Sequence, residues 1–262
     1  MKKRPVVALV LGGGGALGFA HIGVIEALLE NNIPIDMVVG TSMGAVVGAS
    51  YCSGYSLDQM KKFAEDISLF KMIDVHFNFS GLVSGRRVVK MLKEVIKDVN
   101  TEDLPIKFVC NAVDLLTGKE VVLDKGNVIK NVRASLSVPG VFVPVKLNNM
   151  VLVDGGVINN MPHDIAKQLG ADIIIAVDVV TKSTLTELPK TMLGYFIQSW
   201  FIAQKELQNN KKKFYDVLIR PDTFSYAQTD YKGELALEIC DRGKQETLKH
   251  INKIIKLISE FK

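Results

Sequence analysis

Apolar positions in the N-terminal part of the chain alternate between short continuous runs and helix-spaced positions. The run Val6–Leu11 is aliphatic throughout, as is typical of a strand buried on both faces of a parallel sheet. Phe19–Glu30 places its apolar side chains at helical spacing, and Met37–Val39 is a second apolar run before a helix of small residues. This order of strand, helix, strand and helix predicts an α/β fold with a mostly parallel central sheet.

The remainder of the chain continues the mixture of helical and strand-like patterns. Helical spacing recurs in Tyr51–Asp66, with Ser56 as N-cap, and in Arg87–Val99, Asn127–Leu136, Thr191–Gln204 and Leu235–Phe261. Strand-like runs are Ile106–Ala112, Glu120–Leu123, Val141–Val145, Met150–Val153, Ile173–Val179 and Tyr215–Ile219. Ser68–Leu82 lacks a clean period and is expected to form either a loop over the site or a plain surface excursion. Because no repeat or linker interrupts the pattern, we expect a single domain over residues 1–262.

Composition narrows the class of protein. Hydrophobic residues make up 48% of the 262 positions and charged residues 23%, so a sizeable core is available and disorder is not expected. A net charge of +4, without interleaved basic and aromatic residues, argues against a nucleic-acid partner. The three cysteines are odd in number and widely separated, which indicates reduced thiols in a cytoplasmic protein and no disulfide framework or metal site.

The relation of the chain to membranes follows from two stretches. Basic residues before the first apolar run outline a secretory leader, but Gly12–Gly15 interrupts the run and no clean cleavage-site pattern follows. No later stretch reaches the roughly 18 uninterrupted apolar residues of a membrane-spanning helix, so we expect a soluble or peripheral protein. Thr191–Lys213 sets apolar residues beside a lysine cluster, which fits an interfacial helix, but we favour a core-facing helix with a solvated basic end.

A serine stands in the tightest turn that the pattern predicts. Gly40-Thr-Ser42-Met-Gly44 follows an apolar strand and precedes a helix, which is the context of a nucleophile elbow. Gly40 and Gly44 lack the side chains that so tight a turn would exclude. Ser42 would stand at a helix N-terminus, where the dipole favours developing negative charge. A structural turn is the alternative, but we predict that Ser42 is a nucleophile.

The glycine-rich stretch after the first strand admits two interpretations. Gly13-x-Gly15-x-x-Gly18 matches the dinucleotide fingerprint, with Asp36 near the expected acidic position. In that fingerprint the acid lies at the carboxyl end of the second strand, whereas Asp36 precedes the strand. We therefore favour an oxyanion hole, in which backbone N–H groups of the loop face Ser42, and we expect no cofactor.

A serine nucleophile needs a group that takes its proton. Among the histidines, His163 follows in the order of a hydrolase triad but stands at a helix start, and His21 is expected to pack within the first helix. Asp154 closes an apolar strand before Gly155 and Gly156, so its carboxylate would emerge at the sheet edge; a plain turn aspartate is the alternative. As a base, Asp154 needs a pKa raised by desolvation, because a carboxylate with a pKa of about 4 is a weak base at neutral pH.

Together these motifs resemble the patatin-like phospholipase family. The glycine loop, the serine elbow and Asp154-Gly-Gly156 occur in that order within residues 5–180, and the likeness is greatest to compact bacterial members related to the catalytic domain of neuropathy target esterase. The resemblance implies a three-layer α/β/α sandwich and calcium-free hydrolysis of lipid acyl esters by a Ser42–Asp154 dyad. It also implies an oxyanion hole from Gly13, Gly14 and Gly15, with the Met43 N–H as a further donor. Residues 190–262 would form a C-terminal helical extension.

One position departs from the family pattern. Family members often carry Arg or Lys before the last glycine of the loop, where this chain has Leu17. If that cation holds the loop or a substrate phosphate, activity is weaker here or the substrate less anionic. Arg86, Arg87 and Arg133 are candidate replacements, but we favour the interpretation that they are solvated helix charges. A weakly active or regulatory protein on the same fold is therefore the alternative function, and thioester cleavage or transacylation would use the same residues.

Overall fold

An α/β sheet forms the middle of the computed structural model, which describes residues 4–67, 75–78, 81–83, 85–180, 188, 191–229 and 231–261. Among these residues the sheet has eight strands, in the order β10-β9-β1-β2-β5-β8-β7 with β6 paired to β5. The parallel pairs join β1 (Val7–Leu11), β2 (Met37–Gly40), β5 (Lys107–Asp114), β9 (Ile173–Val177) and β10 (Val217–Ile219). The antiparallel pairs add β6 (Glu120–Leu123), β7 (Val145–Leu147) and β8 (Met150–Asp154) beyond β5. The predicted mostly parallel sheet is confirmed.

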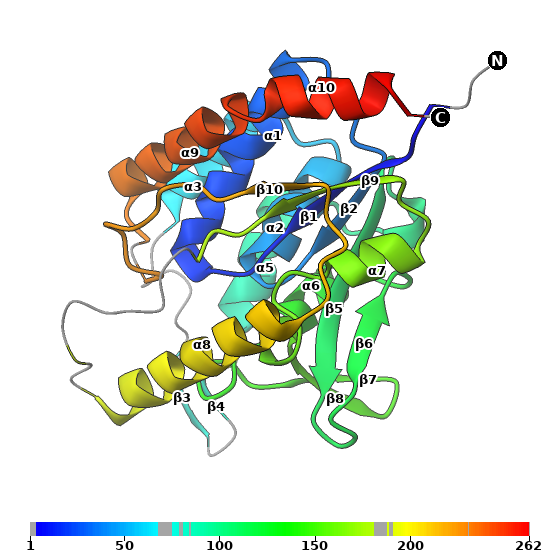
Figure 1. The fold of residues 1–262 in the computed structure, drawn as a ribbon. Coiled ribbons are helices and arrows are strands. Elements are labelled where there is room, and N and C mark those ends of the chain that lie inside the picture. The colour runs from blue at the N-terminus through cyan, green and yellow to red at the C-terminus, as the bar shows by residue number, and fades with distance from the viewer. Residues whose placement is uncertain are drawn as a thin grey trace.

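Strand register places two loops side by side. Leu11, the last residue of β1, is paired with Gly40, the last residue of β2. Because the strands are parallel, the glycine loop after β1 and the serine turn after β2 leave the sheet at the same edge (Figure 1).

Helices cover the two faces of the sheet unequally (Figure 1). The larger core packs α1 (Ala20–Glu30), α2 (Met43–Cys52), α3 (Leu57–Asp66), α5 (Arg86–Val95), α6 (Val128–Ser135), α9 (Gly233–Leu248) and α10 (Ile251–Ser259) on one face. The smaller core lies on the opposite face, under α7 (His163–Gln168) and the chain near Phe214. The remaining long helix, α8 (Met192–Asn210), packs against the turn η3 (Gly155–Val157) after β8. None of the described helices is long and apolar enough to cross a membrane.

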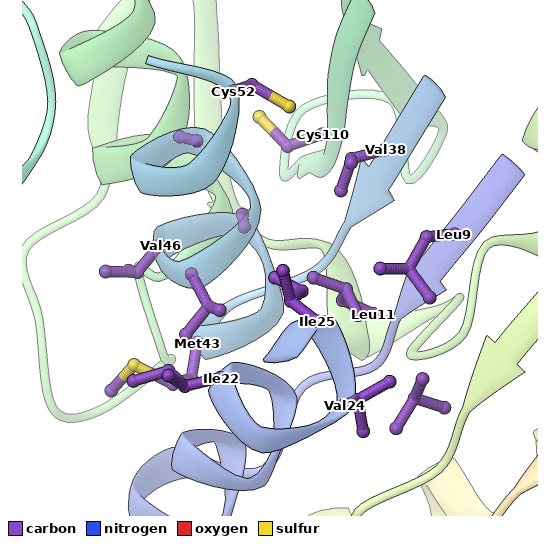
Figure 2. Packing of buried hydrophobic residues seen from close by; sticks show 14 of the residues in the cluster. Leu9, Leu11, Ile22, Val24, Ile25, Val38, Met43, Val46, Cys52 and Cys110 are labelled. Carbon is purple, nitrogen blue, oxygen red and sulfur yellow. The ribbon is translucent and has the colours of Figure 1, made fainter. Parts of the chain in front are cut away.

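The larger core joins the first two strands to the first two helices. Figure 2 shows Leu11 of β1 beside Ile25 of α1 and Met43 of α2 beside Ile22 of α1, while Leu9 and Val38 extend the cluster along β1 and β2. All three cysteines of the chain are buried free thiols. Apolar packing on this face therefore holds together the elements that surround the serine turn.

Several predicted boundaries differ from the structure; among them, Arg87–Val99 ends at Val95 and Thr191–Gln204 extends to Asn210. Tyr51–Asp66 is not one helix, because α2 extends to Cys52 and α3 begins only after Ser56, whose side chain caps the Gln59 N–H in a reciprocal capping box. The C-terminal helix likewise divides at Lys249–His250, and Ile251 and Ile254 after the break are buried. The predicted strand Val141–Val145 begins only at Val145. Of the segment Ser68–Leu82, only β3 (Val75–Asn78) and the start of β4 (Gly81–Val83) are described, as an antiparallel pair, and the rest lies outside the described residues.

Candidate active site

Ser42 occupies the turn between β2 and α2. It is the N-cap of α2, with φ 53° and ψ −123°, a positive φ that residues with a side chain rarely adopt. Its N–H donates to the Ser135 hydroxyl at 3.1 Å, and its side chain lines a cavity. The strained turn therefore holds Ser42 exposed to that cavity at the N-terminus of a helix.

The glycines of the turn are required by the close approach of neighbouring backbone. A Cβ on Gly44 would lie 2.1 Å from the Leu11 carbonyl oxygen, and a Cβ on Gly40 would lie 2.6 Å from the Gly44 carbonyl oxygen. Gly18 has a similar role in the glycine loop, because its Cβ would lie 2.4 Å from Met43 Cγ. A side chain at any of these three positions would displace the strand, loop or helix that places Ser42.

Asp154 ends β8 with its carboxyl group fully buried. Its Oδ1 accepts a hydrogen bond from the Gly156 N–H at 2.8 Å, whereas Oδ2 has no hydrogen-bond partner among the described residues. The Ser42 hydroxyl lies close enough to the carboxyl group to lower its pKa, although it does not complete a hydrogen bond to Oδ2 in this conformation. Burial outweighs this effect and raises the pKa of Asp154 to about 7. The carboxyl group can therefore take up and release a proton near neutral pH.

The glycine loop offers fewer free donors than the sequence suggests. The Gly13 N–H already donates to the Asn160 carbonyl oxygen at 3.2 Å, which corrects its assignment as an oxyanion donor. The N–H groups of Gly14, Gly15 and Met43 donate to no acceptor in the described part of the chain, and all three residues line the cavity that contains Ser42. Gly15 has φ 57°, and a Cβ there would lie 2.4 Å from the Gln228 carbonyl oxygen. The candidate donors are therefore Gly14, Gly15 and Met43.

A buried asparagine joins the serine turn to the turn after Asp154. The Thr41 hydroxyl donates to Asn111 Oδ1 at 2.7 Å, and a Cβ on Gly155 would lie 2.3 Å from the same oxygen. Asn111 Nδ2 donates in turn to the Asn159 carbonyl oxygen at 2.9 Å. Sequence reasoning missed Asn111, because no local pattern distinguishes a buried amide from a surface one.

Two further side chains hold backbone carbonyls at the site. His21 Nε2 lies 2.7 Å from the Gly12 carbonyl oxygen, and burial lowers the pKa of His21 to about 4, so the neutral ring donates this hydrogen bond. Gln204 of α8 donates through Nε2 to the Gly156 carbonyl oxygen at 2.8 Å. The packed role expected for His21 thus includes holding the glycine loop, and α8 is tied directly to the turn that follows Asp154.

The cavity around Ser42 and Asp154 has a volume of about 170 Å³ and an apolar wall. Aliphatic and aromatic side chains of α3, α5, α8 and the chain after α6 form most of this wall, among them Phe63, Met91, Leu92, Leu136, Phe142, Ile197, Trp200 and Phe201. The inner face of α8 therefore faces the interior, as one of the two interpretations of Thr191–Lys213 predicted. The site can receive an apolar chain whose end reaches Ser42.

Other candidate residues lie away from the cavity. His163 packs against the rings of Phe214 and Tyr215 and does not line the cavity, so the structure does not support it as a base for Ser42. Asp36 lies at the amino end of the sheet and accepts a hydrogen bond from the Val7 N–H at 2.8 Å, far from the position of a ribose-binding acid.

The three arginines considered as replacements for a basic residue at position 17 do not line the cavity either. Leu17 is buried in the larger core. Arg133 is not a solvated helix charge but a buried side chain that donates to the Ser137 hydroxyl at 2.6 Å and lies over the Phe142 ring. Arg86 and Arg87 are exposed at the start of α5. Among the described residues, no group of three or more His, Cys, Asp or Glu side chains is placed to hold a metal ion.

Comparison with known families identifies one match over the part of the chain that forms the site. The model of the family described as patatin-like phospholipase matches residues 9–167, which contain the glycine loop, Ser42 and Asp154. The chain is 36% identical over 180 residues to an uncharacterized NTE family protein of Mycobacterium bovis, covering 68% of this chain and 50% of the relative. It is 34% identical over 208 residues to the neuropathy target esterase sws of Drosophila melanogaster, covering 76% of this chain and 14% of the relative.

Solved structures share the fold at low sequence identity. VipD from Legionella pneumophila is similar over 95% of this chain and 67% of its own, with a TM-score of 0.60 and 16% identity. ExoU from the type III secretion system of Pseudomonas aeruginosa, solved in complex with SpcU, is similar over 97% of this chain and 53% of its own, with a TM-score of 0.52 and 16% identity. The chain spans about half the length of the Mycobacterium relative, so these matches concern shared parts of longer proteins.

Proposed function

This chain belongs to the patatin-like phospholipase family, and on that premise we propose that it is a serine hydrolase that cleaves acyl esters of lipids. The observation that carries the proposal is the pairing of Ser42, held in a strained turn, with the buried carboxyl group of Asp154, whose pKa is about 7. The apolar wall of the cavity supports a fatty-acyl chain as the part of the substrate that enters.

In the proposed reaction Asp154 acts as the base for Ser42. Its carboxylate takes the hydroxyl proton while Ser42 Oγ attacks the ester carbonyl carbon, and the carbonyl oxygen becomes an oxyanion. When the tetrahedral intermediate collapses, Asp154 returns the proton to the leaving alcohol and the acyl group remains on Ser42. Water then attacks the acyl-enzyme with Asp154 as base once more, which releases the fatty acid and restores the Ser42 hydroxyl.

Backbone donors would stabilise the negative charge that develops on the carbonyl oxygen. The N–H groups of Gly14, Gly15 and Met43, which find no acceptor among the described residues, are the candidates, and the N-terminus of α2 adds the positive end of its dipole. A carboxylate that acts directly on serine lacks the histidine of a full triad. We therefore expect a slower catalyst than a triad hydrolase, suited to ester substrates.

Labelling with a fluorophosphonate probe tests the proposal. Wild-type protein is expected to react at Ser42, and Ser42→Ala is expected to abolish labelling and lower ester hydrolysis by about a thousandfold or more. Ser50→Ala is the matched control, because Ser50 lies on the same helix, buried and away from the cavity. A folded wild-type protein that neither labels nor hydrolyses any ester would contradict the proposal and favour a regulatory protein on this fold.

Measured hydrolysis rates decide which class of acyl substrate the protein prefers. Thioester cleavage and transfer of the acyl group to another alcohol would use the same Ser42 and Asp154 chemistry. Purified protein should be compared on lysophospholipids, diacyl phospholipids and acyl thioesters. We expect the oxygen esters of lipids to give the highest kcat/KM.

We also propose that α8 contacts the lipid surface from which the substrate comes. Its inner residues Ile197, Trp200 and Phe201 line the cavity, whereas its outer face leaves Met192, Tyr195, Phe196, Ile202 and Leu207 exposed. Large apolar side chains exposed together on one helix face suit insertion at a membrane surface. A lipid that passes such a helix moves from the apolar part of the membrane to the apolar cavity. Cytoplasmic location remains a prediction from cysteine usage.

A further inference from the structure

Asn160 lies where the glycine loop, the serine turn and the turn after Asp154 meet. Its side chain is only 6% exposed, and it lines the cavity. A Cβ on Gly13 would lie 2.5 Å from Asn160 Oδ1 and 3.0 Å from Ser42 Cβ, and a Cβ on Gly156 would lie 3.0 Å from Asn160 Oδ1. Asn160 therefore contacts backbone beside both proposed catalytic residues, although sequence analysis assigned it no role.

Two hydrogen bonds join Asn160 to the same residue of the glycine loop. The Gly13 N–H donates to the Asn160 backbone carbonyl at 3.2 Å, and Asn160 Nδ2 donates to the Gly13 carbonyl oxygen at 3.0 Å. Any residue at position 160 could accept the first bond. The second requires a side-chain donor, and an amide of this length supplies one.

The second hydrogen bond sets the orientation of the next peptide N–H. The Gly13 carbonyl and the Gly14 N–H belong to one planar, trans peptide group, so they point in opposite directions. Gly14 lines the cavity, and its N–H has no acceptor among the described residues. A peptide between two glycines has little steric resistance to rotation, so a bond that holds its carbonyl is needed to keep its N–H in place.

We propose that Asn160 is a positioning residue of the oxyanion hole, an inference that rests on the proposed function. Its amide holds the Gly13 carbonyl and thereby aims the Gly14 N–H at the oxygen of the bound ester. The donor is then already oriented when negative charge develops, so the transition state does not bear the free-energy cost of turning the peptide.

Replacement of the amide by groups of the same shape tests this role. Asn160→Leu removes the donor, and Asn160→Asp replaces it with an acceptor at neutral pH. For both variants we expect kcat to fall by about tenfold to a hundredfold, KM to change by less than about twofold, and the rate of fluorophosphonate labelling to fall with kcat. The labelling rate responds because the phosphonyl oxygen of the tetrahedral adduct occupies the same hole.

A control separates this effect from a loss of stability. Asn127 caps α6 by accepting a hydrogen bond from the Lys130 N–H at 3.0 Å, and it does not line the cavity. Asn127→Ala should lower Tm while kcat stays at the wild-type value.

The outcomes distinguish this inference from the proposed function. If the wild type hydrolyses esters while both Asn160 variants keep kcat within about threefold, the role of Asn160 is overturned and the proposed function stands. If the loss of kcat in the Asn160 variants equals the fraction of protein that is unfolded, the role of Asn160 is overturned as well. A folded wild type without labelling or hydrolysis overturns the proposed function, and this inference with it.

Discussion

At the scale of the residue, the burial of Asp154 affects both reactivity and stability. Removal from water disfavours the carboxylate and raises its pKa from 3.8 to about 7. The native state therefore holds a proton more tightly than the unfolded chain does. The resulting stabilisation is fully present below pH 3.8 and is lost as the pH rises through about 7. An ionised Asp154 is thus a useful base held at the expense of stability.

The pH dependence of catalysis follows from this pKa. We expect kcat/KM to rise with pH along a single limb centred near 7, because Asp154 must be ionised to take the Ser42 proton. A pH–rate profile on a neutral ester, between pH 5 and about 9, measures it. A profile that is flat across this range would contradict Asp154 as the base.

The same shift predicts that activity and stability oppose each other at this position. Asp154→Asn should abolish hydrolysis yet raise Tm at pH 8, with a smaller gain at pH 5, because it removes a buried charge. Asp114 is the matched control: the Val151 N–H and the Thr117 hydroxyl lower its pKa, so Asp114→Asn should lower Tm at pH 8. Thermal unfolding at the two pH values measures the change in Tm of both variants. A lowered Tm for Asp154→Asn at pH 8 would contradict a raised pKa of Asp154.

At the scale of elements, α1 and α9 approach so closely that their backbones touch. A Cβ on Gly23 of α1 would lie 1.8 Å from the Cys240 carbonyl oxygen, and a Cβ on Gly243 of α9 would lie 1.9 Å from the Ala20 carbonyl oxygen. The helices predicted as a C-terminal extension therefore pack directly on the helix that follows the glycine loop. Their contact helps to place the loop beside Ser42.

A methyl group at this crossing should force the two helices apart. Gly243→Ala is expected to lower the free energy of unfolding by about 1–3 kcal/mol through overpacking. Gly170→Ala is the control, because Gly170 has φ 89° and open space around its Cβ, so only backbone strain of about 1 kcal/mol is added. Urea unfolding measures both variants. If Gly243→Ala costs no more than Gly170→Ala, the close crossing does not determine stability.

At the scale of the whole molecule, α8 separates the cavity from the surface that we propose meets the lipid. The side chains of Phe196 and Ile202 are 51% and 53% exposed on its outer face, whereas Trp200 and Gln204 line the cavity on its inner face. Gln204 also binds the turn after Asp154. One helix thus connects the proposed membrane contact to the site.

Removal of the outer apolar side chains should weaken membrane binding. The double variant Phe196→Ser with Ile202→Ser is expected to reduce partition onto phospholipid vesicles by about tenfold or more, because each large apolar side chain that becomes buried in lipid contributes roughly 1.5–3 kcal/mol. Leu116→Ser is the control, since Leu116 is 71% exposed on the turn between β5 and β6. Vesicle flotation measures partition, and equal flotation of the double variant and wild type would contradict the proposed contact.

The sequence by itself predicted the features that depend on neighbours along the chain. Strand and helix periodicity is local, so the α/β class, the mostly parallel sheet and most elements could be predicted and are confirmed. The serine turn could also be found, because Gly40 and Gly44 are spaced around Ser42 as a tight strand-to-helix turn requires. Ser56 is confirmed as an N-cap, but the continuous helices predicted over Tyr51–Asp66 and Leu235–Phe261 were wrong, since caps and packing break a periodicity that continues through them.

Only the tertiary structure decided which groups meet. Asn160 and Gly13 are 147 positions apart, and Asn111 reaches both Thr41 and Gly155 from a third strand. The pKa of Asp154 and the occupation of the Gly13 N–H likewise depend on what the fold places around them. Burial and hydrogen bonding are properties of surroundings that distant segments create, and no local pattern contains them.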